Sequence, residues 1–487
     1  MIYPDVIHHG AGEGVTGSCH QLQLDAAHSV LIDCGLFQGS EADHTAHVGT
    51  SANAVDVNIE TLKLLIVTHV HADHVGRIPH LLAAGFKGPI LCSEPSARLL
   101  PLVLEDAFRI ELGGNKLQIA RYLKLIDERL IAVPFAEWFS VVNTPELSCR
   151  IRLQRAGHIL GSAFVECDVN YPREQRRRRV VFSGDFGSSH TPILPDPRPP
   201  ERADLLVLES TYGDRLHEDR TTRQARLEAV IDKALADHGT VLIPAFSVGR
   251  TQELLYEIED ILHRKALPGP DQIDPSTDAT LPVNWPQLPV ILDSPLASRL
   301  TKVYQAFDDL WDEEAAERLT LGCKPLGFRQ LITLDSHAKH QQTLNYLAST
   351  GRPAIVIAGH GMCAGGRIVN YLKAMLGDPR HNVVFVGYQG KGTPGAAIQT
   401  YGPKGGYVEL NGQRYEIKAG VETLGGYSAH ADRQELVDFV MGMNVLPAEI
   451  RLVHGEARAR KMLKQALESR CAERAHRPIV VEQHPVP

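Results

Sequence analysis

Short apolar runs separated by glycine-containing turns dominate the chain up to about residue 208. Runs of this length, bounded by turn residues, are typical of buried β-strands. Apolar residues at helical spacing also predict one helix over 75–85 and a longer helical stretch over 96–127. The pattern therefore predicts a sheet structure that a few helices cover.

A different pattern begins near residue 209. Leu227, Ile231 and Leu235 follow helical spacing, and this helix is predicted to end at Gly239. Further helices alternate with apolar strands at 240–243, 290–292, 354–357 and 383–386. Strand and helix in alternation indicate a parallel three-layer α/β domain.

A turn-rich β pattern returns after about residue 388. The simplest arrangement is one α/β domain formed by residues 1–208 and 388–487, which is split by an inserted α/β domain at 209–387. Within the insert, residues 266–289 are rich in proline, aspartate and glutamine, so they are predicted to form a long surface loop.

The composition is that of an ordinary globular protein of 487 residues, with 43% hydrophobic and 22% charged residues. No apolar stretch approaches the roughly 20 residues that span a bilayer, and the start of the chain lacks the pattern of a secretory signal. The eight cysteines are scattered without a CxxC pair, which argues against a zinc ribbon or a disulfide framework. We expect a cytoplasmic protein without a membrane partner.

The net charge of −8 weakly opposes a nucleic-acid partner, because proteins that bind polyanions are often basic. Cations in a site and a local groove can still attract phosphate. The one basic run, four arginines at 176–179, lies between two predicted strands and is interpreted as a hairpin loop. Either this loop contacts a substrate or it is a solvated turn.

The most informative residues follow the apolar run at 64–67. The sequence THVHADH at 68–74 places three imidazoles and a carboxylate within six residues. Side chains at i and i+2 of an extended chain point the same way, so one pair can share an ion while the next pair turns toward a second. Imidazole suits zinc and its neighbours, and a carboxylate can help to hold a second divalent ion. The segment therefore predicts a metal site.

Four other apolar runs end in a residue that can bind a metal or transfer a proton. These residues are Asp33, Asp185, Glu209 and His454. Strand ends that share one edge of a sheet bring remote residues together, so this recurrence favours one assembled site. His158 differs, because it lies in the small-residue turn AGHILGSA. By itself it is more typical of a structural histidine, although the glycines on both sides leave room for an ion.

This set of residues resembles the signature of the metallo-β-lactamase superfamily, an HxHxDH run with a later histidine, an aspartate and a final histidine. The chain is most similar to the β-CASP branch, the RNA-processing nucleases that include the endonuclease of eukaryotic mRNA 3′-end formation and its prokaryotic relatives. The narrower match is carried by ESTYG at 209–213, SAHAD at 428–432, LVHGE at 452–456, IPAFSVGR at 243–250 and GMCAGGR at 361–367. It extends from about residue 15 to about residue 456.

The resemblance implies an α/β fold, namely a metallo-β-lactamase αββα sandwich with an inserted three-layer α/β β-CASP domain. It also implies two zinc ions per chain, although the ligand types permit manganese as well. One ion would be held by His69, His71 and His158 and the other by Asp73, His74 and His454, with Asp185 bridging them. Asp33 would bind no ion itself but would orient a ligand histidine or the metal loop.

The resemblance further implies a catalytic role for residues at the metal site and beside it. His430 would act as the general acid that protonates the leaving oxygen, and Glu209 would orient it and keep it protonated. Asp73 and Asp185 are the other catalytic candidates. His454 bears on the substrate, because members of the branch that process DNA typically have no ligand at this position.

The stretch at 359–364 matches the GxGxxA pattern of dinucleotide-binding folds. That fingerprint needs an acidic residue at the end of the next strand, whereas Asp378 precedes that strand, so we expect no dinucleotide. A glycine-rich helix N-terminus binds anions well. Gly361, Gly365 and Arg367 are therefore candidate contacts to RNA phosphate, although this chain lacks the serines that the branch usually carries before the Gly-Met pair.

The resulting prediction is a zinc-dependent endoribonuclease that hydrolyses single-stranded RNA by a two-metal mechanism. One alternative is a ribonuclease with additional 5′–3′ exonuclease activity. Another is a dinuclear hydrolase of a different phosphodiester, a small ester or a lactam. A non-catalytic RNA-binding subunit would have lost ligands, and this chain retains all seven. The sequence leaves open the cleavage preference and the oligomeric state, including a homodimer.

Overall fold

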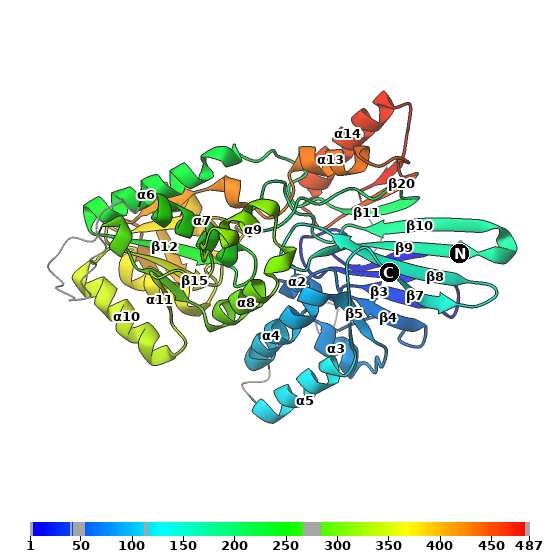
Figure 1. The fold of residues 1–487 in the computed structure, drawn as a ribbon, viewed down its shortest axis with the longest axis horizontal. Coiled ribbons are helices and arrows are strands. Elements are labelled where there is room, and N and C mark those ends of the chain that lie inside the picture. Colours follow the sequence, from blue (N-terminus) through cyan, green and yellow to red (C-terminus); the bar gives the residue numbers. More distant parts are fainter. Residues whose placement is uncertain (1–2, 39–40, 42–53, 112–114, 266–283, 483–487) are drawn as a thin grey trace. The chain divides into compact units, whose positions relative to one another are not determined.

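The computed structural model describes residues 3–38, 41, 54–111, 115–265 and 284–482 of the chain. The surface loop predicted at 266–289 lies almost wholly outside these residues. The chain divides into two compact units (Figure 1). Unit 1 combines the residues up to 190 with 196–216 and those from 429 onward, and unit 2 combines 191–195 with 217–428.

Unit 1 contains two sheets that each have a parallel part. The first has the order β1 (Asp5–Gly10), β2 (Cys19–Gln23), β3 (Ser29–Ile32), β4 (Leu62–Ile66), β5 (Ile90–Ser93) and β6 (Leu130–Val133). The second has the order β21 (Ile479–Val481), β20 (Glu449–Val453), β11 (Leu205–Glu209), β10 (Arg176–Phe182), β9 (Ala163–Tyr171), β8 (Ser148–Arg155) and β7 (Trp138–Asn143). In the first sheet, β3, β4, β5 and β6 are parallel to one another. In the second sheet, β10, β11, β20 and β21 are parallel.

The two sheets of unit 1 enclose a shared apolar core. Alternate residues of β3, such as Ile32, and of β9 and β10, such as Val165 and Phe182, are buried in one cluster. Successive side chains of a strand point to opposite faces of its sheet, so alternate residues reach this shared core. The tight core fixes the strand ends that carry the candidate ligands.

Helices cover the outer faces of both sheets in unit 1 (Figure 1). The first sheet is accompanied by α2 (Ala72–Val75), α3 (Ile78–Ala83), α4 (Glu94–Glu111) and α5 (Lys116–Asp127). Through Leu436 and Leu463, α13 (Arg433–Met441) and α14 (Ala457–Glu473) pack on Leu206 of the second sheet. The predicted αββα sandwich is thus confirmed. The helix predicted at 75–85 corresponds to α3, and the helical stretch predicted at 96–127 corresponds to α4 and α5.

The interpretation of the arginines at 176–179 as a hairpin loop was wrong. They form the first half of β10, and the turn before them is the short helix Pro172–Glu174. Arg177 and Arg179 pair with carboxylates of β9, with Arg179 Nη1 2.7 Å from Glu166 Oε2. Because β9 supplies buried acids directly opposite, the arginines can continue a strand despite their charge.

Unit 2 is built on one parallel sheet, as the alternating pattern predicted. Its order is β14 (Leu331–Thr333), β13 (Val290–Asp293), β15 (Ala354–Gly359), β12 (Thr240–Ala245), β16 (Asn382–Phe385) and β19 (Gly420–Thr423). A separate hairpin joins β17 (Tyr407–Leu410) and β18 (Gln413–Glu416). Because β19 completes the parallel sheet, residues up to 428 pack with unit 2, beyond the predicted boundary at 387.

Helices flank this parallel sheet on both faces (Figure 1). One face carries α10 (His337–Thr350), α11 (Gly366–Met375) and α12 (Pro394–Tyr401), whose Leu344, Ile368 and Ile398 join the apolar cluster of the sheet. The other helices of unit 2 are α6 (Arg223–Asp237), α7 (Arg250–Lys265), α8 (Pro295–Ala306) and α9 (Glu313–Thr320). None of the described helices combines the length and the apolar character that a membrane crossing needs.

Candidate metal centre and active site

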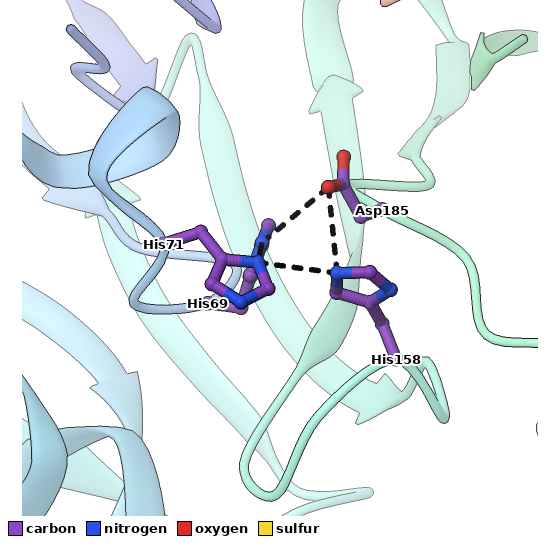
Figure 2. A group of neighbouring side chains, drawn as sticks. All are labelled: His69, His71, His158 and Asp185. Carbon is purple, nitrogen blue, oxygen red and sulfur yellow. Dashed lines mark hydrogen bonds and ion pairs between the residues drawn. The ribbon is translucent and has the colours of Figure 1, made fainter. Parts of the chain in front are cut away.

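The first group of candidate ligands lies entirely within unit 1 (Figure 2). His69 and His71 follow β4, and His158 lies in the turn between β8 and β9. Nε2 of His69 lies 3.0 Å from Nδ1 of His71, which lies 3.2 Å from Nε2 of His158. Oδ2 of Asp185, which follows β10, completes the group at 3.5 Å from His69 Nε2 and 3.6 Å from His158 Nε2.

These distances fit a tetrahedral metal ion. Ligand atoms at about 2.0–2.1 Å from a tetrahedral centre lie roughly 3.3–3.4 Å from one another. The four measured separations, 3.0, 3.2, 3.5 and 3.6 Å, bracket that value. Burial lowers the pKa of His69 and of His158 well below the ordinary value, so both rings are neutral and present the lone pairs that a metal requires.

A second group of ligands meets the other oxygen of Asp185. Oδ1 of Asp185 lies 3.1 Å from His74 Nε2 and 3.5 Å from His454 Nε2. His454 Nε2 also lies 3.4 Å from His74 Nε2 and 3.5 Å from Oδ2 of Asp73. One carboxylate thus turns one oxygen toward each group, which is the arrangement that a bridging ligand between two ions requires.

The charge of the second group calls for a cation. Burial alone would lower the pKa of His454, but the Asp185 and Asp73 carboxylates outweigh it and raise that pKa to about 9. Burial is outweighed at His74 too, where Asp185 and Asp33 raise the pKa well above its ordinary value. Without a metal, protons would therefore supply the positive charge here. A divalent ion bound by the same atoms would displace them.

Asp33 binds two residues of the loop at 68–74. Its Oδ2 lies 2.7 Å from Nδ1 of His74 and accepts a hydrogen bond from Thr68 Oγ1 at 2.8 Å. Its Oδ1 accepts from the Thr68 backbone N–H at 2.8 Å. On the second sheet, Thr211 Oγ1 lies 3.1 Å from Nδ1 of His454. Both contacts fix a ring so that Nε2 faces the ligand group.

Glu209 and His430 form a third group beside the bridging aspartate. Glu209, the last residue of β11, is buried, whereas the side chain of His430 is 18% exposed. His430 Nδ1 lies 3.1 Å from Glu209 Oε1, which also accepts the Phe186 backbone N–H at 2.6 Å. Nε2 of His430 faces Oδ2 of Asp185 at 3.9 Å. A proton on this nitrogen is therefore presented to the metal groups.

Close backbone packing sets these side chains in place. A β-carbon on Gly187 would lie 2.1 Å from the carbonyl carbon of Gly157, so only glycine allows the Asp185 segment to reach the turn that carries His158. Asp33 and His454 both have positive φ, at 61° and 50°. Such backbone is unfavourable for these residues and is found most often at functional sites.

The three candidate phosphate contacts belong to unit 2, whereas the ligand groups belong to unit 1. Gly361 and Gly365 belong to the turn between β15 and α11. Arg367, in the first turn of α11, donates to Oδ1 of Asp293 at 2.5 Å and to the carbonyl of Leu334 at 2.9 Å. Their contact with phosphate stays a prediction.

The sequence reasoning did not identify several residues that support the site. Thr68 directly follows a predicted strand and Thr211 lies two residues after Glu209, yet a threonine near a strand end carries no distinctive signal. Glu435 accepts hydrogen bonds from two segments of the site. Its spacing from Asp432 is that of a helix capping box, a pattern that the sequence does contain.

Comparison with known proteins matches nearly the whole chain. Residues 16–244 match the metallo-β-lactamase superfamily, 251–398 the Beta-Casp domain, and 414–478 the Zn-dependent metallo-hydrolase RNA specificity domain. Ribonuclease TTHA0252 of Thermus thermophilus is 35% identical over 457 residues, which cover 93% of this chain and 93% of that protein.

Archaeal relatives are longer than this chain. Transcription termination factor FttA of Pyrococcus abyssi is 31% identical over 81% of this chain and 57% of that protein. The FttA protein of Thermococcus kodakarensis is 30% identical over 90% of this chain and 64% of that protein. The chain thus spans less than two thirds of either archaeal protein. It belongs to the β-CASP branch of the metallo-β-lactamase superfamily, as a metal-dependent hydrolase with ribonuclease relatives.

Proposed function

We propose that this protein is a zinc-dependent endoribonuclease that hydrolyses single-stranded RNA at a dinuclear site, leaving 3′-hydroxyl and 5′-phosphate ends. The observation that carries the proposal is the pair of ligand groups that share Asp185, with Glu209 and His430 beside them. Imidazole and carboxylate ligands suit zinc, while manganese is the other metal that this set accepts.

His69, His71, His158 and Asp185 would hold one ion, and Asp73, His74, His454 and Asp185 the other. Two bound divalent ions lower the pKa of water and neutralise charge on the phosphoryl group. The residues of the chain supply what the ions do not. Asp33 and Thr211 orient His74 and His454, and their hydrogen bonds to Nδ1 direct Nε2 of each ring toward the ligand group.

His430 would donate the proton that the leaving 3′ oxygen requires. Its Nε2 is on the side of the ring that faces the bridging aspartate, whereas Nδ1 is engaged by Glu209. Burial lowers the pKa of His430, but Glu209 and Asp185 outweigh this effect, so the pKa lies above its ordinary value. A histidine with such a pKa keeps its proton near neutral pH and can act as a general acid.

RNA as the substrate is supported by the match of residues 414–478 to an RNA specificity domain and by the similarity to a ribonuclease over 93% of the chain. His454 completes the second ligand group, in agreement with the RNA-processing members of the branch. Gly361, Gly365 and Arg367 are proposed contacts to the RNA backbone. Phosphate at a glycine-rich helix N-terminus is favoured by free backbone N–H groups.

The test is the cleavage of a 5′-labelled single-stranded RNA and of DNA with the same sequence by the zinc-loaded protein. We expect internal cuts in the RNA, intact DNA, and 3′-hydroxyl ends that a poly(A) polymerase extends. Release of the label as a mononucleotide would instead show 5′–3′ exonuclease activity. Intact RNA in the presence of a fully loaded site would reject the proposal and favour hydrolysis of another phosphodiester, an ester or a lactam.

A further inference from the structure

Glu435, in the first turn of α13, joins two segments of unit 1 that lie far apart in the sequence. Its carboxylate accepts hydrogen bonds from Ser188 Oγ at 2.7 and 2.6 Å, one to each oxygen. Oε1 accepts from the Ser189 backbone N–H at 2.7 Å, and Oε2 accepts from the Asp432 backbone N–H at 2.9 Å. One side chain therefore binds residues 188–189 and 432 at once.

Each of these segments carries a residue of the site. The segment before Ser188 begins with Asp185, which presents an oxygen to each ligand group. The segment before Asp432 contains His430. The two segments are also joined directly, since Ser188 N–H donates to the Ala429 carbonyl at 3.0 Å and Ala431 N–H donates to the Phe186 carbonyl at 2.8 Å. The carboxylate of Glu435 adds a side-chain connection of both segments to α13.

Capping alone does not account for this arrangement. In a capping box the glutamate binds the backbone N–H of the cap residue, and Glu435 does so at Asp432. The bonds from Ser188 and Ser189 are additional and engage both carboxylate oxygens. Hydrogen bonds to a charged acceptor are stronger than those between neutral groups. The carboxylate therefore anchors the Asp185 segment to the same helix that begins after His430.

We infer that Glu435 is a positioning residue that sets the distance between the His430 acid and the bridging Asp185, through its bonds to Ser188, Ser189 and Asp432. The inference rests on the proposed function, because it assigns Glu435 to the proton transfer by His430. Glu435 itself contacts neither ligand group. Its loss would shift the His430 segment relative to the Asp185 segment, and His430 relative to the leaving oxygen, so bound zinc is measured beside the rate.

The leaving atom provides a readout that a merely structural role would not change. When the P–O3′ bond of RNA breaks, the departing oxygen must take up a proton. A 3′-bridging sulfur at the same linkage departs as a stable thiolate and has little need of that proton. A variant that misplaces the acid should therefore cleave the oxygen-linked RNA slowly and the sulfur-linked RNA at nearly the normal rate.

The experiment compares wild type, Glu435→Ala, Ser188→Ala and His430→Ala on both RNAs under single-turnover conditions, with bound zinc measured in each. The matched control is Asn115→Ala, which removes a helix cap in unit 1, where Asn115 accepts from the Gln118 backbone N–H at 3.2 Å. Glu435→Ala should slow the oxygen-linked RNA by about 10- to 100-fold, and Ser188→Ala should do so less. Both should cleave the sulfur-linked RNA within about twofold of wild type.

Equal slowing of both RNAs by Glu435→Ala, or no slowing at all, would overturn the positioning role. Ser188→Ala keeps the cap contact at Asp432, so it tests the role even if Glu435→Ala folds poorly. If His430→Ala shows the sulfur rescue and both other variants do not, the proposed function stands and the inference about Glu435 falls. If wild type cleaves neither RNA, the proposed function falls and the inference falls with it.

Discussion

Glu209 Oε1 lies 3.1 Å from Nδ1 of His430, on the side of the ring opposite the nitrogen that faces Asp185. A carboxylate at Nδ1 selects the tautomer and fixes the plane of an imidazole. Nδ1 then donates its proton to Glu209, and in the protonated ring the second proton is on Nε2, directed at the ligand groups. The proposed acid and the proposed bridging ligand thus lie after neighbouring strands, β10 and β11, and in the segment before α13.

Substitution of Glu209 by glutamine should slow RNA cleavage without loss of metal. The amide no longer stabilises the protonated ring of His430, so the single-turnover rate should fall by about 10- to 100-fold, part of the 10²–10⁴-fold that general acids typically contribute. Zinc content and RNA affinity should match those of wild type. The control is Glu409→Gln on the exposed side of β17, which should leave the rate unchanged. An unchanged rate in Glu209→Gln would remove the carboxylate from the proton transfer.

Substitutions of two aspartates should separate the two metal positions. Asp185 has an oxygen in both ligand groups, whereas Asp73 contributes to only one. After dialysis against trace zinc, Asp73→Asn should keep one tightly bound ion per chain and Asp185→Asn should keep less than one. Elemental analysis of the protein measures this ratio. Identical stoichiometry in the two variants would contradict the bridging role of Asp185.

Alanine at Gly187 should disturb the site through the backbone. The new β-carbon would meet the carbonyl group of Gly157 at 2.1–2.2 Å, which forces the turn of His158 away from Asp185. Overpacking of this kind typically costs about 1–3 kcal/mol of stability, and zinc affinity should fall as well. Gly377→Ala is the matched control, since a β-carbon there meets nothing within 4 Å. Normal zinc affinity in Gly187→Ala would show that the turn can shift freely.

The stability of unit 2 should depend on the protonation of His381. Burial lowers the pKa of His381, against a smaller raising effect of Asp378, and the neutral ring accepts the Thr240 backbone N–H at 2.9 Å. Below about pH 6.5 the unfolded chain therefore binds a proton at His381, whereas the folded chain binds it only at a lower pH. This contribution to stability is present above that pH and is lost as the pH falls.

Thermal unfolding of wild type and His381→Gln across pH 7.5 to 5.5 tests this prediction. Wild type should be the more stable of the two at pH 7.5, and its advantage in Tm should shrink on acidification. The other titrating groups are common to both proteins, so they cancel in the difference. A Tm difference that stays constant or grows toward pH 5.5 would refute the prediction.

Several residues of the candidate site could be located from the sequence because each follows a buried strand. Apolar runs that end in Asp33, His69, Asp185, Glu209 and His454 locate both the strands and the shared edges at which those residues meet. The αββα sandwich and the parallel sheet of the insert followed from the same runs and from the resemblance of the motifs. These signals are local, so a single sequence contains them.

What the sequence did not predict depends on partners remote in the chain. The arginines at 176–179 continue a strand because Glu166 and Asp168 of the neighbouring strand β9 form ion pairs with Arg179 and Arg177. The bond between Ser188 and Glu435 joins residues 247 positions apart. Residues up to 428 pack with unit 2 because the short strand β19 pairs with β16. None of these pairings leaves a periodic pattern in the sequence.

The most direct measurement is the single-turnover cleavage of single-stranded RNA by zinc-loaded wild type and His430→Ala. The account predicts that wild type cuts internal bonds of the RNA and that the variant binds as much zinc and RNA. It also predicts that the variant is slower by about 10²–10⁴-fold, the range of general acid catalysis. A variant that cleaves RNA as fast as wild type, or a fully loaded wild type that leaves RNA intact, would contradict it.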